Sequence, residues 1–311
     1  MSFKAHPHTQ QRHKQASSSD RLIRRESFRT ARFLILACVV AAFPAEASAE
    51  LAPASEPRIL VTANLSAYFA SLDGSLQTPF GGAKGTTSSG RPTVDEVGLD
   101  GLGVHLLADM SVTLFGRHSL HVSYVGLAET GSKRLDRNLI SQGQTFFAGS
   151  RAKSRLEMPL VRVGYRADWL RLSNARFSLV PEIGAARLDF AYRLTAPGAT
   201  GKVNRAYVVY FAYWGVQLRG SIYDRLTAEL DLYASAGLSN VVSIESDLRL
   251  LYSVWQSEHL EASLLLGVRG LWLNYKDDQR DEQNHINVRS GAYSPNPWAG
   301  LHLGVRFLYS L

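Results

Sequence analysis

Apolar residues alternate with polar ones along most of this chain, and that period of two limits the fold more than any other feature of the sequence. In the segment 225–237 every second residue is apolar, from Ala228 to Ala236, and Glu229 and Asp231 fall between them. Successive side chains of a β-strand point to opposite faces, so this pattern predicts strands with one apolar and one polar face. We find no long stripe with the 3.6-residue period of a helix. The chain is therefore expected to be all-β.

The alternation recurs along the chain and predicts ten strands. They cover residues 58–71, 102–115, 119–129, 154–169, 177–191, 207–222, 225–237, 242–255, 259–275 and 297–310. Eight or twelve strands remain open, because 154–160 and 242–250 are less regular, and Pro159 removes one ladder hydrogen bond. Near Arg187 the apolar phase of its strand switches, which we interpret as a β-bulge.

The predicted connections alternate between short and long. Short ones are expected at Gly116-Arg117, 170–176, Asp224 and 256–258, and long ones at 72–101, 130–153, 192–206 and 276–296; the brief connection near Ser239 is the exception. A soluble sandwich has no reason to sort its loops this way, whereas outer-membrane barrels have short periplasmic turns and long external loops. A closed ring also pairs every backbone group in hydrocarbon. We therefore predict an antiparallel up-and-down transmembrane β-barrel.

The N-terminus carries the features of an export signal. Basic residues up to Arg32 precede the apolar run 33–43 (FLILACVVAAF), which is too short to span a bilayer as a helix. The sequence ASA at 47–49 then fits the small-x-small pattern of signal-peptidase sites. We predict a signal peptide over 1–49 and a mature barrel domain over 50–311. An uncleaved anchor helix and lipidation at Cys38 are the alternatives.

Removal of residues 1–49 changes the charge of the chain. The full chain has 34 Lys and Arg, 27 Asp and Glu and a net charge of +7. The predicted signal holds 8 of the basic and 3 of the acidic residues, which leaves 26 and 24, a net charge of +2. The basic character therefore does not predict nucleic-acid binding. The single cysteine, Cys38, is also removed, so no disulfide or thiolate site is expected in the mature part.

The last predicted strand has a distinctive pattern. Leu303, Val305, Phe307, Tyr309 and Leu311 alternate with other residues up to the final position. This strand is similar to the C-terminal signal that the bacterial barrel-assembly machinery recognises, although that signal usually ends in an aromatic residue rather than in leucine. We predict that these five residues form the assembly signal.

Aromatic residues lie near many predicted strand ends, as they do in the girdles that outer-membrane barrels carry at both interfaces. Aromatics favour strands in any setting, so this feature alone is weak. The residues are Phe115, Trp169, Phe177, Tyr192, Tyr207, Tyr223, Trp255, Tyr275 and Trp298.

Together these features resemble small bacterial outer-membrane β-barrel proteins of about eight to ten strands, over residues 58–311. Two local patterns, VDEVGL at 94–99 and YSPNPWAGLHLGVRF at 293–307, look like a family of such barrels without a characterised function. The resemblance implies a location in the outer membrane, contact with its lipids and lipopolysaccharide, and barrel-assembly machinery during biogenesis. We also expect a monomer and no nucleic-acid partner.

The polar face of the strands carries charges of both signs on neighbouring strands. A barrel of about ten strands has an interior that long side chains can fill, so we predict a luminal charge network that plugs the barrel. Its members are His105, Asp109, Arg162, Arg166, Glu182, Arg219, Glu229, Asp231, Asp247, Arg249, Glu261, Arg269 and Arg306. The predicted function is a structural or surface-interaction role without catalysis. A narrow channel or transporter for small or apolar solutes is one alternative, and a lipid A-modifying barrel enzyme is the other.

Two enzyme classes have partial signatures in the sequence. His121 and Ser123 have the His-x-Ser spacing of outer-membrane lipid A deacylases, with histidine as base and serine as nucleophile, but they face the predicted lumen and lack an evident acidic partner. For the omptin proteases, Asp95, Glu96 and Asp100 lack a matching Asp-His pair. The acidic cluster 277–285 suits a solvated loop better than a cation site. We therefore expect no catalytic residue, no cofactor and no metal site.

Overall fold

The computed structural model describes residues 59–76, 93–141, 144–168, 170–171, 177–235, 241–276, 292–297 and 300–311. These residues belong to one compact unit, Ser55–Leu311. The predicted signal peptide, the acidic cluster 277–285 and most of the first long loop lie outside the described residues. Within the described ranges, no helix is long and apolar enough to cross a membrane.

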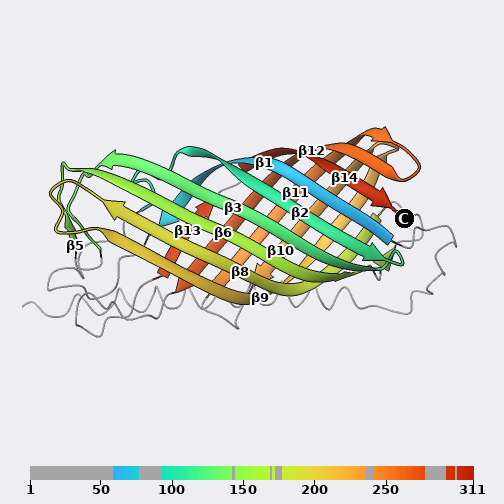
Figure 1. Ribbon diagram of the computed structural model, residues 1–311, viewed down its shortest axis with the longest axis horizontal. Helices are drawn as coiled ribbons and strands as arrows, with labels where there is room; N and C mark the ends of the chain where they lie inside the picture. Colours follow the sequence, from blue (N-terminus) through green and yellow to red (C-terminus); the bar gives the residue numbers. More distant parts are fainter. Residues whose placement is uncertain are drawn as a thin grey trace, which may run out of the picture. The chain divides into compact units, whose positions relative to one another are not determined.

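Ten long strands form a closed antiparallel β-barrel, which confirms the predicted fold class and strand count (Figure 1). Along the chain they follow one another around the wall, and β1 pairs with β14 to close the ring. The strands are β1 (Ile59–Ser75), β2 (Leu102–Leu114), β3 (His118–Arg134), β6 (Arg151–Ala167), β8 (Phe177–Thr195), β9 (Val203–Tyr223), β10 (Leu226–Ser235), β11 (Val241–Gln256), β12 (Leu260–Lys276) and β14 (Gly300–Ser310).

Four short strands, none of them predicted, add to this wall. β4 (Leu139–Ser141) and β5 (Gln144–Phe146) form a separate hairpin between β3 and β6. β7 (Leu170–Arg171) pairs with the start of β8, and β13 (Ala292–Pro297) lies between β1 and β12. β13 lies in the region where the last predicted strand was expected to begin, at residue 297.

The predicted long loops at 130–153 and 192–206 are shorter than expected, because the strands around them are longer. β3 continues to Arg134 and β6 begins at Arg151, while β8 continues to Thr195 and β9 begins at Val203. At the opposite end of the barrel, the connections between β2 and β3, β9 and β10, and β11 and β12 are short, as expected. Leu311 lies at that end, where it pairs through its backbone with Ile59. Figure 1 shows β3, β6, β8 and β9 extending away from it.

The turn between β2 and β3 follows from its two central residues. Phe115 and Gly116 both have positive φ angles, 52° and 66°, and Arg117 N–H donates to the Leu114 carbonyl at 3.1 Å. Such primed turns match the twist of paired strands, and they require φ > 0 at both central positions. Glycine adopts this conformation without strain, so Gly116 favours the tight hairpin.

The proline prediction for β6 is confirmed, and the bulge prediction for β8 is wrong. Pairing between β6 and β8 is interrupted opposite Met158 and Pro159, yet the register is the same on both sides of the gap. Pairing of β8 with β9 runs without a shift through Arg187. The change of phase at Arg187 therefore has another cause.

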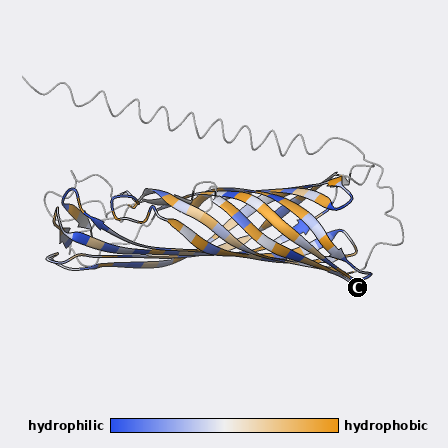
Figure 2. Cartoon of the chain, turned by 90° about the horizontal axis from the view of Figure 1, so that it is seen from above, coloured by the Kyte–Doolittle hydropathy of each residue, from blue (hydrophilic) through white to orange (hydrophobic). Residues whose placement is uncertain are grey.

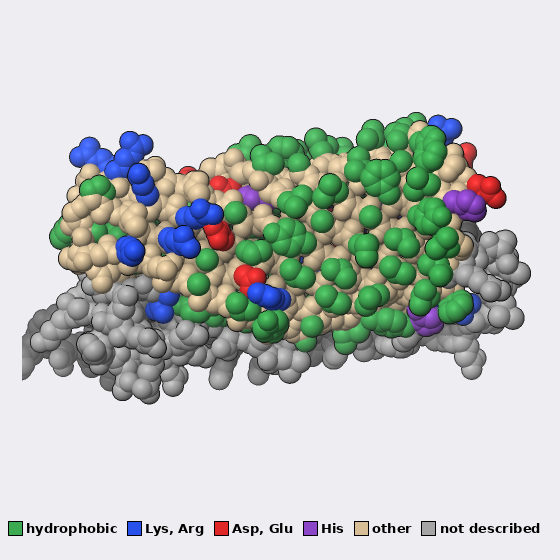
Figure 3. All heavy atoms as spheres, in the orientation of Figure 1, with side chains coloured by type: hydrophobic (Ala, Val, Ile, Leu, Met, Phe, Trp, Pro, Cys, Tyr) green, Lys and Arg blue, Asp and Glu red, His purple; other side chains and the backbone are tan. Residues whose placement is uncertain are grey.

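The cause is an inversion of hydropathy along the strands. On β6, Val163 and Tyr165 face outward and Arg162 faces inward, whereas beyond Pro159 the outward residues are charged and the inward ones, such as Leu156, are apolar. On β8 the same exchange occurs at Arg187. A strand in lipid needs an apolar outer face, and a strand in water needs an apolar inner one. Figure 3 shows apolar side chains covering one part of the barrel and Lys and Arg side chains gathered over the other, and Figure 2 shows the matching change of residue hydropathy along the strands.

The aromatic residues divide between the two ends of the barrel. Phe115, Tyr223 and Trp255 lie exposed on the rim that carries the short turns. Tyr192, Tyr207 and Tyr275, which were expected in the other girdle, point inward and are buried. Trp169, Phe177 and Trp298 lie outside the residues whose side chains are described. The exposed apolar side chains form a band around the barrel, which we call the apolar belt. The prediction of a girdle at both interfaces fails for these three tyrosines, because they lie on parts of their strands beyond this belt.

Candidate functional site: an ionic layer and an apolar core in the lumen

The interior of the barrel has three levels, and the middle one is a buried ionic layer. Six arginines meet six carboxylates there, and most of them are buried. We define the layer as Asp109, Arg162, Arg166, Glu182, Arg219, Glu229, Asp231, Glu245, Asp247, Arg249, Arg269 and Arg306. Opposite charges are equal in number, which suits a region from which water is largely excluded.

One group of the ionic layer spans β6, β11, β12 and β14. Glu245 accepts hydrogen bonds from both Arg162 and Arg269. Arg269 also contacts Asp247 at 3.5 Å, and His302 Nε2 lies 2.8 Å from the other oxygen of Asp247. Arg162 reaches Glu245 across the lumen, since β6 and β11 are not neighbours in the wall.

A second group joins β2, β9, β10, β11 and β14. Arg306 binds both oxygens of Glu229 at 2.6 Å, and Arg249 hydrogen-bonds to Asp231. Arg219 lies 3.4 Å from Glu229 and Arg249 lies 3.5 Å from Asp109. Bidentate pairs of this kind are both stronger and more directional than single contacts.

A third group surrounds Glu182. It accepts hydrogen bonds from Arg166 at 2.6 Å and from the Tyr213 hydroxyl at 2.6 Å, and His121 Nδ1 lies 2.9 Å away. Arg166 also donates to the hydroxyl of Tyr233 at 2.7 Å. The Tyr233 ring packs under the guanidinium of Arg162 at 5.0 Å, which links this group to the first.

The ionic layer leaves little free space. A cavity within it, lined by Arg162, Asp231, Arg249 and Arg269 among others, has a volume of about 10 Å³. This is close to the lower limit for one water molecule. The side chains therefore fill the lumen at this level instead of lining a channel.

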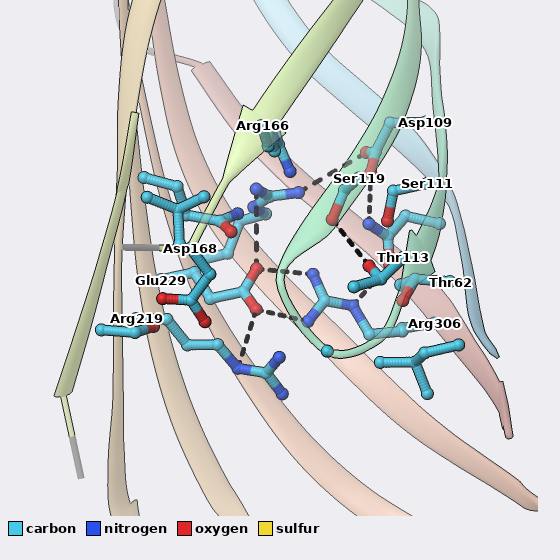
Figure 4. A pocket seen from close by; sticks show the side chains of 17 residues that line it. Thr62, Asp109, Ser111, Thr113, Ser119, Arg166, Asp168, Arg219, Glu229 and Arg306 are labelled. Atoms are coloured by element: carbon cyan, nitrogen blue, oxygen red, sulfur yellow. Dashed lines mark hydrogen bonds and ion pairs between the residues drawn. The ribbon is translucent and has the colours of Figure 1, made fainter. Parts of the chain in front are cut away.

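On the side of the short turns, the lumen opens into a polar vestibule of about 300 Å³ (Figure 4). Arg219 and Arg306 converge on Glu229 on one wall, while the hydroxyls of Thr113 and Ser119, 2.7 Å apart, lie on the other. The vestibule ends at the ionic layer, whose side chains form its floor.

On the opposite side of the ionic layer the lumen is filled by apolar side chains. We call this region the external core. It includes Leu127, Leu156, Met158, Leu188, Phe190, Leu194, Val203, Leu273 and Tyr275 from the strands, with Val94, Val97 and Leu99 from the segment before β2. All of these except Tyr275 are at most 2% exposed. The side chains of the external core are therefore buried like those in the interior of a soluble protein.

The segment 93–99 folds into the mouth of the barrel and is anchored there by polar contacts. Its backbone bonds to Gly74, and Ser154 Oγ donates to the Val97 carbonyl at 2.6 Å. Gly131 packs so closely on Gly98 that a Cβ atom would lie 1.8 Å from the Gly98 oxygen. Only glycine fits this close approach of two backbones.

A partly exposed ion pair fastens the same segment to the connection between β3 and β4. Arg137 Nε and Nη2 donate to the two oxygens of Glu96 at 2.8 and 3.0 Å. These hydrogen bonds hold the pKa of Glu96 below its usual value and raise that of Arg137. The hydroxyl of Thr93 likewise lowers the pKa of Asp95. The acidic residues of this segment thus serve local structure.

The structure places the thirteen predicted network residues on the inner side of the wall, but not in one network. Eleven of them belong to the ionic layer. His105 instead lies 3.3 Å from Glu129, near the external core. Glu261 accepts a hydrogen bond from Ser263 at 2.9 Å and joins no ion pair that the structure describes. The pairing of Arg219 with Glu229 and of Arg249 with Asp231 matches the expected neighbours.

Sequence reasoning missed Glu245, Asn64, Tyr213 and Tyr233 as members of the site. Glu245 lies two residues before Asp247 on the same face, so strand parity alone was enough to find it. Asn64 accepts from Arg306 at 2.6 Å, and its amide donates to Asp109 at 2.5 Å. The two tyrosines share the polar face of β9 and β10, and only the tertiary structure brings them together with Glu182 and Arg166.

The five predicted assembly residues lie on the outer face of β14. Leu303, Phe307, Tyr309 and Leu311 are exposed, and Val305 is half-buried. Their role in assembly stays a prediction.

For the deacylase reading, the structure supplies the acidic partner that the sequence did not reveal, since His121 contacts Glu182. His121 Nε2, however, faces Arg166 Nη2 at 3.4 Å, and both His121 and Ser123 are buried inside the lumen. This arrangement suits an accepting imidazole nitrogen better than a base for Ser123, and it keeps lipid away from the pair. In the described part of the chain, no group of His, Cys, Asp and Glu has the arrangement of a metal site.

The closed ring, its exposed apolar belt and the sorting of its turns define an integral β-barrel protein of the bacterial outer membrane. No family model matches this chain, and no curated protein sequence matches it.

Among solved structures, the chain is similar to the outer membrane protease OmpT from Escherichia coli, with 8% identity, a TM-score of 0.41, and 81% of this chain and 96% of that chain covered. The translocator domain of autotransporter NalP from Neisseria meningitidis gives 12% identity, a TM-score of 0.36, and coverage of 92% and 98%. Ail, the attachment invasion locus protein of Yersinia pestis, has 7% identity and a TM-score of 0.32, with 80% of this chain and 99% of that chain covered. These likenesses concern the fold alone.

Proposed function

We propose that this protein is a non-conducting outer-membrane barrel. Its extension, by which we mean the part of β3, β6, β8 and β9 that continues beyond the apolar outer surface, serves as a platform for surface interactions. The observation that carries the proposal is the external core. A channel for ions or polar solutes needs a hydrated path, whereas Leu156, Leu188 and Phe190 fill the lumen with tightly packed apolar side chains.

The ionic layer supports the same reading. Replacing any one partner of a buried ion pair leaves an uncompensated charge, so such pairs resist rearrangement. Arg162 and Arg306 connect walls that are not adjacent, and they act as struts across the lumen. A gate at this level would have to break several of these contacts together.

The extension supplies the surface for the second half of the proposal. β3, β6, β8 and β9 rise beyond the apolar belt with largely polar outer faces and a largely apolar inner face. In outer-membrane barrels the end opposite to the short turns faces the environment. An extracellular sheet with its own core is a rigid support for recognition of a partner.

A narrow channel is the second candidate, and the vestibule of about 300 Å³ favours it, because it gives solutes access to the lumen from one side. Single-channel recording in planar bilayers decides between the two. We expect no reproducible conductance steps from the folded protein. Steps that depend on the protein concentration and persist after repurification would overturn the non-conducting reading.

The proposed function includes no catalytic activity, and an assay of fatty-acid release from lipid A tests this. His121→Ala and Ser123→Ala variants are compared with the parent protein in vesicles that contain lipid A, and released fatty acid is measured. We expect no release by any of the three. Release by the parent that both variants abolish would establish the deacylase reading instead.

A further inference from the structure

The outer face of the extension carries a dense group of cations. We define the basic face as Arg134 on β3, Arg151, Lys153 and Arg155 on β6, and Arg193 on β8. All five side chains are exposed. Figure 3 shows Lys and Arg side chains gathered over this part of the molecule, beyond the apolar belt.

The strand register places like charges directly opposite one another. Arg134 is the cross-strand partner of Arg151, and Arg155 is the partner of Arg193. Like charges in such positions destabilise a sheet. Glu157, which binds Arg155, is the carboxylate paired with this face in the described structure. Folding stability alone therefore does not account for the arrangement, whereas a bound polyanion does.

Two of the arginines, Arg134 and Arg151, are held in place with their Nη groups free. Arg134 Nε donates to the Gly149 carbonyl at 2.9 Å, and Arg151 Nε donates to Ser132 Oγ at 3.1 Å. Their Nη groups have no partner among the residues that the structure describes. A guanidinium anchored through Nε presents its two Nη atoms as a fork, which matches phosphate or carboxylate oxygens. Anchoring also lowers the entropy lost on binding.

The height of the basic face above the membrane identifies the kind of partner. The apolar outer face of β6 begins at Pro159, and Arg155 and Arg151 precede it by four and eight residues. At about 3.3 Å per residue and a tilt near 40°, these residues lie roughly 10 and 20 Å above the belt. The side chains point sideways, parallel to the membrane surface, because they lie on the outer face of the wall.

We infer that the basic face binds the anionic headgroup of an outer-leaflet glycolipid, through the phosphates and carboxylates of its saccharide. This deepens the proposed function, since it names a partner for the extension, and it rests on the orientation adopted there. The headgroup of a lipid anchored beside the barrel lies at this height above the membrane and faces these side chains from the side. A soluble polyanion carries the same charges but has no reason to be confined to the lateral face.

The test compares two double variants of the full-length protein. Arg151→Gln/Lys153→Gln removes two cations of the basic face, and Arg117→Gln/Arg225→Gln removes two exposed cations from the short turns at the other end. Both pairs change the net charge equally. Heat-modifiable migration in detergent gels checks that each variant is folded, and purified lipopolysaccharide with a phosphorylated core serves as the probe.

Each cation near an anionic surface contributes enough for loss of two to weaken binding by roughly tenfold to thirtyfold. We expect this loss for Arg151→Gln/Lys153→Gln, with a smaller salt dependence, and an affinity within about twofold of the parent for the control pair. Equal loss in both variants, or none in either, refutes the basic face as the site. If dextran sulfate, a soluble polyanion, competes as well as lipopolysaccharide mole for mole of charge, the glycolipid assignment is wrong. Neither result depends on whether the barrel conducts.

Discussion

Arg306 on β14 donates two hydrogen bonds of 2.6 Å to the two carboxylate oxygens of Glu229 on β10. β14 pairs with β1 and β12 in the wall, so this contact crosses the lumen instead of following the sheet. Both side chains are buried. The pair therefore ties together two parts of the barrel that the backbone ladder leaves apart.

Replacement of Glu229 by Gln leaves the guanidinium of Arg306 without its charged partner. Breaking a buried pair from one side costs about 3 to 5 kcal/mol, so we expect a loss of that size in the free energy of unfolding. The measurement is urea unfolding of the barrel refolded in lipid vesicles, followed by tryptophan fluorescence. Glu261→Gln, at a half-buried position outside the ion pairs, is the control and is expected to change stability by less than about 0.5 kcal/mol. Equal losses of stability in the two variants would contradict the role of the Arg306–Glu229 pair in stabilising the barrel.

The position of the apolar belt is testable with an introduced charge. Leu266 is exposed on β12 between the exposed residues Leu250 and Leu303. Arginine on the lipid face near the bilayer centre costs about 2 to 4 kcal/mol, so Leu266→Arg is expected to lose that much stability in vesicles. Asn204→Arg, on the outer face of the extension, is expected to be nearly neutral because that position faces water. A reversed order of the two losses would place the membrane elsewhere.

The external core predicts a local effect of Phe190→Ala. Phe190 is 1% exposed, and truncation of a buried phenylalanine costs about 3 to 5 kcal/mol. We expect faster proteolysis of the extension in intact vesicles, with heat-modifiable migration of the membrane part retained. Thr195→Ala, an exposed position on the same strand, serves as the control. Loss of both properties together would mean that the extension and the membrane part do not unfold separately.

The Glu96–Arg137 pair predicts a pH dependence of the segment 93–99. Because the pKa of Glu96 in the folded protein lies below its unfolded value, near 4.5, its contribution to stability is complete above that pH. It is lost as the pH falls through the lower, folded value. The carboxylate is partly exposed, so the contribution is at most about 1 kcal/mol.

Hydrogen exchange of the amides in this segment, corrected for the intrinsic rate, measures the effect. Protection is expected to decrease as the pH falls below about 4.5, whereas Glu96→Gln is expected to show low protection throughout, so that the two proteins converge in acid. Protection that rises as the pH falls would give the wrong sign and exclude this pair as the fastening contact.

Much of the fold follows from local pattern. Alternation assigns Glu229, Asp231 and Arg249 to the lumen, because the side-chain period of a strand is fixed at two. It also allows ion pairs between adjacent strands to be predicted, such as that of Arg219 with Glu229. The phase change at Arg187 is visible in the sequence, but the sequence does not distinguish a bulge from a strand that leaves lipid for water, which reverses its apolar face without any change of register.

The sequence by itself determined the class of fold, favoured ten strands and assigned charged residues such as Glu229 and Arg249 to the lumen, because these features depend on neighbours in the chain. Only the tertiary structure decided which charges meet across the lumen, as Arg162 meets Glu245 and Arg306 meets Glu229. Those contacts depend on the tilt of the strands and on closure of the ring, which bring together residues far apart in sequence. Closure likewise buries Phe190 beside Tyr275, whereas the register of β6 against β8 sets Arg155 opposite Arg193 on the outer face.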